Sequence, residues 1–124
     1  MSEDLHTVSQ NGKVCYMEIP ATDIRASADF YEKVFAWKIR KDNEGNISFD
    51  DTVGQISGMW VIGRKPSAET GILISIMVTS AADTLKLIAK NGGKIIREPE
   101  GDGEVIALFS DPAGNVFCLY QSSH

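Results

Sequence analysis

The chain has 124 residues, of which 43% are apolar and 23% charged, a composition typical of one globular domain rather than a disordered segment. Its net charge of −5 disfavours nucleic acid and anionic membranes as partners. No stretch approaches the roughly 20 apolar residues of a membrane helix, and the polar, acidic residues 1–6 do not resemble a signal peptide. Two cysteines make no disulfide framework, so we expect a cytoplasmic protein.

The first half of the chain predicts a strand, a helix and three strands. Alternation over residues 14–19 indicates a strand that ends at Pro20, because proline cannot continue a central ladder. Asp23 is placed to cap a helix that runs to about residue 35. Three short strands are expected next, at residues 37–40, 47–49 and 59–63.

The second half repeats this order. Residues 72–78 predict a strand, and Ser80 with Asp83 forms a weaker version of a capping box at the start of a helix. Asn91-Gly92-Gly93 is a suitable end for that helix, since glycine adopts the left-handed cap conformation without strain. The last three strands are expected at residues 94–97, 104–109 and 116–120.

The two halves therefore read as an internal repeat with an offset of 57 residues, which places Tyr16 on Leu73 and Lys38-Ile39-Arg40 on the segment that ends at Arg97. We predict an α+β fold with tandem modules at about residues 13–65 and 70–122. Together they form one domain, 13–122, after a frayed N-terminus at residues 1–12. The alternative is a single α+β sheet without internal symmetry.

Four segments carry a resemblance to a known family: Glu18–Asp23, Ser27–Trp37, Asn91–Gly93 and Asp111–Asn115. In these segments the chain resembles the vicinal oxygen chelate superfamily, which includes glyoxalase I, bleomycin-resistance proteins and extradiol dioxygenases. Ala36 departs from the pattern, since the family often has glycine there. The resemblance implies two βαβββ modules whose curved half-sheets surround a concave cavity, with helices outside, and a homodimer.

Strand alternation indicates which side chains face that cavity. In residues 72–78 the face with Ile72, Ile74, Ile76 and Val78 is the better candidate for burial under a helix. The opposite faces of several strands form an amphipathic set typical of small-molecule sites. The predicted cavity residues are Tyr16, Glu18, Met59, Val61, Leu73, Ser75, Met77, Cys118 and Tyr120.

In the metal-dependent relatives, the resemblance implies His, Glu or Gln ligands at equivalent points of four strands. Carried over by register, these points fall on Tyr16, Val61, Leu73 and Cys118. This set cannot hold a divalent ion, which requires imidazole, several carboxylates or several thiolates. The histidines, His6 and His124, lie in the terminal segments. We therefore expect neither metal nor cofactor, and metal-dependent glyoxalase I or dioxygenase activity does not transfer.

Glu18 is the candidate catalytic residue, because a carboxylate on an apolar wall can act as a general base or a hydrogen-bond acceptor. The alternative is that Glu18 lies near the strand end and is solvated, or that it pairs with Arg25 or Lys38. Cys118 lacks a histidine to activate it, so a buried, inert thiol is expected. The adjacent pair Asp50-Asp51 is interpreted as two solvated carboxylates at a strand end.

These observations favour a protein that binds a small organic molecule without a metal. The alternative is a metal-independent lyase or isomerase with Glu18 as general base. A third reading is a structural or regulatory dimer whose cavity is filled by its own side chains, among them Met59 and Met77. The identity of the ligand depends on cavity shape, which residue types do not determine.

Overall fold

A computed structural model describes residues 11, 14–68 and 71–122 of the chain. The protein divides into two compact units, with the boundary between Arg64 and Lys65. The frayed segment expected at residues 1–12 lies outside the described residues except for Asn11, and so do His6 and His124. None of the helices among the described residues is long and apolar enough to cross a membrane.

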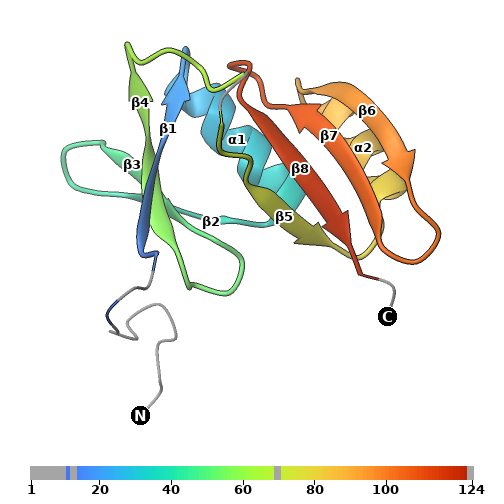
Figure 1. The fold of residues 1–124 in the computed structure, drawn as a ribbon. Helices are drawn as coiled ribbons and strands as arrows, with labels where there is room; N and C mark the ends of the chain where they lie inside the picture. The colour runs from blue at the N-terminus through green and yellow to red at the C-terminus, as the bar shows by residue number, and fades with distance from the viewer. Residues whose placement is uncertain (1–10, 12–13, 69–70, 123–124) are drawn as a thin grey trace. The chain divides into compact units, whose positions relative to one another are not determined.

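The N-terminal unit is a four-stranded sheet with one helix (Figure 1). Its strands lie in the order β1-β4-β3-β2. β1 is parallel to β4, and the other neighbouring pairs are antiparallel. The elements are β1 (Tyr16–Ala21), α1 (Ile24–Phe35), β2 (Lys38–Lys41), β3 (Ile47–Asp50) and β4 (Ser57–Ile62).

The C-terminal unit repeats this topology with the strand order β5-β8-β7-β6. β5 is parallel to β8, and the other pairs are antiparallel. The predicted α+β fold with two βαβββ modules is thereby confirmed, and the alternative of one sheet without internal symmetry is wrong. The elements are β5 (Ser75–Val78), α2 (Ala81–Lys90), β6 (Lys94–Glu100), β7 (Val105–Ser110) and β8 (Val116–Gln121).

Both helices begin at a capping residue, as predicted. Asp23 Oδ1 accepts a hydrogen bond from the Ala26 N–H at 3.1 Å, and Ser80 Oγ accepts one from the Asp83 N–H at 3.1 Å. These bonds satisfy helix N–H groups that have no partner within the helix. Asp23 and Ser80 are separated by the 57 residues of the repeat offset.

The two helices end differently. After α2, Gly92 has a φ of 98° and the Gly93 N–H donates to the Ile88 carbonyl at 2.9 Å, which is a Schellman cap. After α1, Ala36 takes the left-handed conformation, with φ 60° and ψ 33°. An alanine Cβ disfavours this conformation, so α1 ends at some cost in stability.

Several strand boundaries differ from prediction, and two of these strands contain a proline. β1 continues through Pro20 to Ala21, and β6 continues through Pro99 to Glu100. Both are edge strands, where a missing backbone N–H need not interrupt a ladder. β6 also carries two register shifts against β7, which are common near sheet edges.

β5 begins at Ser75 instead of residue 72, so the expected burial of Ile72 and Ile74 is wrong and both are exposed. The reason lies in the neighbouring strand. The Val116 N–H at the start of β8 donates to the Ser67 carbonyl at 2.9 Å. The chain around Ser67 therefore pairs with the start of β8, where residues 72 and 73 would otherwise pair.

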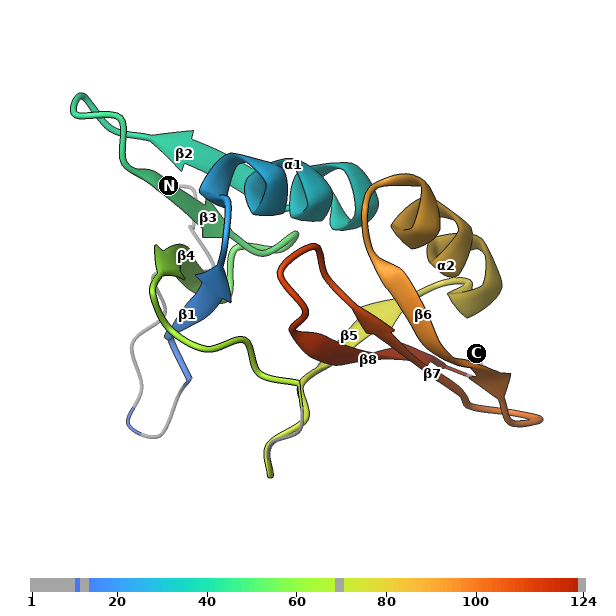
Figure 2. The ribbon, with the colours of Figure 1, turned by 90° about the horizontal axis from the view of Figure 1, so that it is seen from above.

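A stack of aromatic rings joins α1 to one face of the N-terminal sheet. The ring centroids of Tyr31 and Trp37 lie 4.6 Å apart, those of Trp37 and Phe49 4.7 Å, and those of Phe49 and Trp60 4.7 Å. All four side chains are buried. Figure 2 shows α1 running along the side of the unit where β2 and β3 lie. Such ring pairs add about 0.5–1.5 kcal/mol each beyond the burial of their area.

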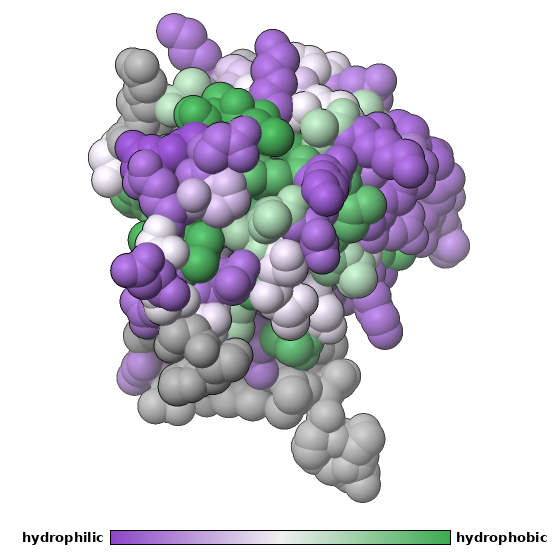
Figure 3. Space-filling view, turned by 90° about the vertical axis from the view of Figure 1, so that its right-hand side faces the viewer, coloured by the Kyte–Doolittle hydropathy of each residue, from purple (hydrophilic) through white to green (hydrophobic). Residues whose placement is uncertain are grey.

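The core of the C-terminal unit is mainly aliphatic, with one aromatic pair. The rings of Phe109 and Phe117 lie 5.8 Å apart, and Leu119 beside them is fully buried. Leu85 and Ile88 of α2 are also buried. Hydrophobic residues remain exposed elsewhere in the unit, and Figure 3 shows a face on which hydrophobic areas lie between hydrophilic ones.

The motif Asp111–Asn115 closes the turn between β7 and β8. Asp111 Oδ1 accepts hydrogen bonds from the N–H groups of Ala113, Gly114 and Asn115 at 2.9–3.0 Å. Asp111 therefore shapes its own turn. Asn115 is buried, and its Oδ1 accepts from the Ser67 N–H at 2.8 Å, which attaches the segment before β5 to this turn.

Gly58 lets β1 and β3 approach β4 closely. A Cβ atom at this position would collide with the Met17 carbonyl oxygen and would come within 2.6 Å of the Phe49 ring. Phe49 is the residue directly opposite Gly58 across the sheet. Its ring therefore covers the glycine, and this contact connects the sheet register to the aromatic stack.

We predict that Ala36→Gly raises the free energy of unfolding by about 0.5–1 kcal/mol, because glycine adopts the left-handed conformation without a Cβ clash. The matched control is Ala89→Gly on the exposed side of α2, which should lower it by about 0.5–1 kcal/mol. Urea unfolding of both variants measures the two changes. A loss of stability in Ala36→Gly would contradict the cap described here.

We predict that Gly58→Ala lowers the free energy of unfolding by at least about 2 kcal/mol, since both the backbone of β1 and the Phe49 ring must move. Gly71, which has no atom within 4 Å of its Cβ position and no positive φ, provides the control. Gly71→Ala should change stability by less than about 0.5 kcal/mol. Thermal or urea unfolding distinguishes the two variants, and equal effects would rule out the close approach.

Candidate functional site

The face of the N-terminal sheet opposite α1, here called the N-terminal open face, carries two rows of side chains that run across all four strands. Residues paired across strands share a face. The side chains on the other face include the buried Phe49 and Trp60, so the rows on the open face are set by the core. The first row is Tyr16, Ser57, Asp50 and Lys38, and the second is Glu18, Met59, Ser48 and Arg40.

Glu18 forms an ion pair on this face. Its Oε1 lies 2.8 Å from Arg64 Nη2, so the structure pairs it with Arg64, just after β4, and not with Arg25 or Lys38. The Glu18 side chain is 40% exposed. Glu18 therefore forms a solvated ion pair and does not lie on an apolar wall. Exposed ion pairs of this kind contribute little to stability.

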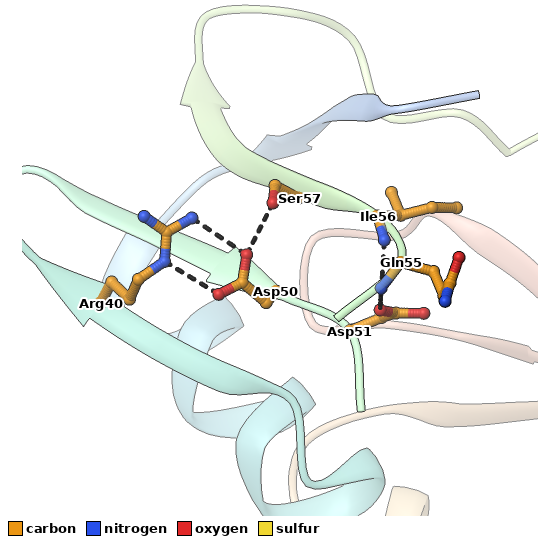
Figure 4. A network of polar contacts seen from close by, with 6 residues as sticks. All are labelled: Arg40, Asp50, Asp51, Gln55, Ile56 and Ser57. Carbon is orange, nitrogen blue, oxygen red and sulfur yellow. Dashed lines mark hydrogen bonds and ion pairs between the residues drawn. The ribbon is translucent and has the colours of Figure 1, made fainter. Parts of the chain in front are cut away.

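Asp50 is the buried polar group of the N-terminal open face (Figure 4). Its carboxylate accepts hydrogen bonds from Arg40 Nε and Arg40 Nη2, each at 3.0 Å, and from Ser57 Oγ at 2.6 Å. The residue is only 7% exposed, so the interpretation of Asp50 as a solvated carboxylate is wrong. Bidentate arginine–carboxylate pairs are among the stronger polar contacts in proteins.

Asp51, by contrast, points into the following turn. Its Oδ1 accepts from the N–H groups of Gln55 and Ile56 at 2.7 and 3.2 Å. Alternation across residues 47–50, with Phe49 facing the core, is the sequence signal that places Asp50 on the open face. That signal predicts a face but not the partner, because Arg40 reaches Asp50 diagonally from a neighbouring strand.

The corresponding face of the C-terminal sheet, here called the C-terminal open face, is more apolar. Its rows follow the same pattern. One row is Ser75, Cys118, Leu108 and Arg97, and the other is Met77, Tyr120, Ile106 and Glu100. Met77 is 73% exposed and Ile106 is 43% exposed.

Cys118 is buried, and its Sγ donates a hydrogen bond to the Leu119 carbonyl at 3.4 Å. Cys15 is exposed, and both cysteines are free thiols. The burial of Cys118 agrees with the expected inert thiol, since a reactive thiolate needs access and a neighbouring positive charge or base.

Tyr120 has a polar partner at the end of β8. Its hydroxyl donates to Glu104 Oε2 at 2.7 Å. This hydrogen bond raises the pKa of Tyr120 above its ordinary value, and desolvation and the negative charge of Glu104 act in the same direction. Tyr120 is therefore a neutral hydrogen-bonding group at physiological pH.

The predicted cavity residues fall on the two open faces with one exception. Leu73 lies before β5 and is exposed, outside the sheet ladder. The assignment of the others as a binding site stays a prediction. The N-terminal open face holds Tyr16, Glu18, Met59 and Val61, and the C-terminal open face holds Ser75, Met77, Cys118 and Tyr120.

The register corrects one position in the comparison of the two units. Glu18 and Arg40 share a row with Met59, while Ser75 and Arg97, their counterparts 57 residues later, share a row with Cys118. Met59, and not Val61, is therefore the counterpart of Cys118. The stretch from Arg97 to Ser110 is three residues longer than the stretch from Arg40 to Asp50, and the turn from Ser110 to Val116 is one residue shorter than the turn from Asp50 to Ser57, so the offset shifts by two residues.

With this correction, the positions at which the family's metal ligands would fall carry a phenol, a thioether, an isobutyl group and one buried thiol. This donor set does not fit a divalent ion, since hard ions bind several oxygens and zinc or iron binds imidazole, carboxylate or thiolate sets. Within residues 11, 14–68 and 71–122, no three His, Cys, Asp or Glu side chains are grouped for metal binding. The positions are Tyr16, Met59, Leu73 and Cys118.

Comparisons with known proteins identify the family. Residues 13–119 match the Glyoxalase/Bleomycin resistance protein/Dioxygenase superfamily, and the chain belongs to it. The chain is similar to a lactoylglutathione lyase from Escherichia coli O157:H7, with 27% identity over 107 residues that cover 74% of this chain and 79% of the relative.

Two solved structures share the fold. One is a member of the same superfamily from Sphaerobacter thermophilus, with 24% identity, a TM-score of 0.71 and coverage of 90% of this chain and 98% of the other. The second is TnmS3, an antibiotic binding protein from Streptomyces sp. CB03234, with 20% identity, a TM-score of 0.65 and coverage of 94% and 98%. The proteins to which this chain is similar thus include a lactoylglutathione lyase and an antibiotic binding protein.

We predict that Tyr120 titrates above its ordinary pKa and that Glu104→Ala lowers its pKa, because the hydrogen bond to the neutral phenol and the repulsion of the phenolate are both lost. Tyrosine ring ¹³Cζ resonances followed against pH report this change for Tyr120 alone. Glu98→Ala, which removes an exposed carboxylate of β6, serves as the control and should leave the titration unchanged. An unaltered Tyr120 pKa in Glu104→Ala would contradict the contact.

Proposed function

We propose that this protein binds a small, mainly apolar organic molecule on its open faces, without a metal. One observation carries the proposal. A sheet face that lies opposite its helix and meets only water usually carries polar side chains. Here several positions of the open faces carry aromatic, sulfur-containing or branched apolar groups instead. They are Tyr16, Met59, Met77, Ile106 and Tyr120.

The exposure of these side chains supports the binding of a ligand on the open faces. Tyr16 is 49% exposed, and Met77 is more exposed still. Aromatic and thioether side chains contact flat organic molecules over large areas, and methionine adapts to irregular shapes. Each open face also carries polar groups that would orient a ligand bound on it, the Tyr120 hydroxyl on the C-terminal open face and the charged groups on the N-terminal open face.

The proposal agrees with the donor chemistry and with the family. The family's ligand positions do not fit a metal, so binding must rest on apolar contact and hydrogen bonds. TnmS3 shows that a protein of this fold can be an antibiotic binding protein. Because the open faces present aromatic and thioether side chains, a planar aromatic compound is the first class of ligand to test.

A metal-independent lyase or isomerase is the second candidate. Glu18 lies in the same row as Met59 on the N-terminal open face, so its carboxylate would adjoin a ligand held there and could remove a proton as a general base. The Glu18→Gln variant separates the two candidates. Loss of turnover with retained binding supports the enzyme, and unchanged behaviour supports the binder.

A homodimer also remains an expectation, because apolar open faces would accept a second copy of the chain as well as a ligand. The third reading, a structural or regulatory dimer, requires these faces to be filled by protein side chains. In that case Met59 and Met77 would not respond to any added ligand.

We predict that a planar neutral compound, 2-naphthamide, shifts the ¹³C-methyl resonances of Met59 and Met77 in a saturable manner. Met17 is an internal control, because it faces the opposite side of β1 from Glu18. The titration is repeated in the presence of a chelator, and the binding constant should not change. Absence of saturable shifts at Met59 and Met77, or dependence of binding on a metal, would refute the proposed function.

A further inference from the structure

From the network around Asp50, we infer that the ligand is an organic anion whose carboxylate or other oxyanion is bound by Arg40. This inference rests on the proposed function and specifies the chemical class of the ligand. The network is the polar centre of the N-terminal open face, and neither the proposed apolar contact nor the general base uses it. Its geometry indicates a prepared anion site.

Arg40 is held in one orientation but remains accessible. Its Nε and Nη2 both bind the buried Asp50 carboxylate, while 55% of its side chain is exposed. A guanidinium has two edges that can donate paired hydrogen bonds. Asp50 occupies the edge formed by Nε and Nη2, and Figure 4 shows Nη1 pointing away from Asp50.

The outer edge, formed by Nη1 and the second hydrogen of Nη2, can donate two parallel hydrogen bonds to one oxyanion. Because Asp50 already fixes the guanidinium, binding costs little further side-chain entropy. Ser57 also contributes, because its hydroxyl donates to Asp50 Oδ1 at 2.6 Å. This hydrogen bond fixes the Asp50 carboxylate, which in turn orients Arg40.

The charge of the cluster also favours an anion. Lys38 lies directly opposite Asp50 in the register of β2 and β3 and is exposed. Lys38, Arg40 and Asp50 together carry one net positive charge, on a chain whose net charge is −5. One ligand carboxylate would neutralise this local excess.

The second unit shows that the fold does not require this network. The turn after β7 uses the same backbone pattern as the turn after β3, with Asp111 and Asp51 accepting from Gly114 and Gly54 respectively. Where the N-terminal unit pairs Asp50 with Ser57, the C-terminal unit pairs Ser110 with Val116.

The counterpart of Arg40 in the second unit is Arg97, which lies opposite Leu108. A βαβββ unit therefore forms without a buried carboxylate behind this arginine. The network is therefore not needed to form the sheet. Arg97 provides a matched control within the same molecule.

The test compares two probes of the same shape, anionic 2-naphthoate and neutral 2-naphthamide, by NMR titration. The wild-type protein should bind naphthoate at least about fivefold more tightly, as charge-assisted hydrogen bonds are stronger than neutral ones. The Arg40 Nε–H resonance should shift with naphthoate alone. Arg97→Gln should keep this preference.

Arg40→Gln should abolish the preference. Arg40→Lys, which keeps the charge but removes the paired donors, should lose most of it. Because removing Arg40 leaves a buried charge on Asp50, the double variant Arg40→Gln/Asp50→Asn provides a neutral, hydrogen-bonded replacement that should fold and also lack the preference. The unperturbed Met17 methyl resonance reports folding in each variant.

Equal preference for naphthoate in the wild type and in the double variant would overturn the inference, and so would a preference that disappears in Arg97→Gln. If both probes shift the Met59 resonance equally and no Arg40 variant changes their binding, the proposed function is retained and the anion site is refuted. If naphthoate shifts only Arg40 and neither Met59 nor Met77 responds, the anion site stands and the apolar binding function fails.

Discussion

The stack of Tyr31, Trp37, Phe49 and Trp60 is the interaction on which the N-terminal unit depends. It joins α1 to the sheet through side chains from β3, β4 and the residue just before β2. Because side chains alternate along a strand, placing Phe49 under the helix sends its neighbours Ser48 and Asp50 to the other side. The core therefore decides which residues form the open face, and a slip of one residue would bury charges and expose the rings.

Gly58 makes this arrangement possible at the centre of the sheet. Its missing side chain lets the Phe49 ring lie across β4 and lets the β1 backbone approach. The same strand then presents Ser57 and Met59 to the open face, one supporting Asp50 and the other offering an apolar contact. Structural and functional positions thus alternate residue by residue along β4.

The two units share a scaffold but differ in the chemistry of their open faces. The helix caps, the strand order and the aspartate-closed turn recur in both. The N-terminal open face has the charged network, whereas the C-terminal open face has Met77, Ile106 and a neutral Tyr120. A repeated fold can diverge in this way because the residues on the open face are not needed to hold helix and sheet together.

Local patterns in the sequence determined the elements, their order, both helix starts and the family. The caps at Asp23 and Ser80 and the turn at Asp111 act over a few residues, so they can be recognised without a structure. Strand ends were less predictable, because Pro20 and Pro99 are tolerated only by virtue of their edge positions, and edges are a property of the assembled sheet.

Only the tertiary structure decided the partners of the polar side chains. Glu18 meets Arg64 across 46 residues of sequence, and Asp50 is buried because Arg40 and Ser57 come from two different neighbouring strands. Alternation along one strand assigns a face to each residue, but the pairing of strands sets the distances between them. Composition and periodicity thus determined a fold with two open sheet faces, and the strand register turned one exposed arginine into an oriented group.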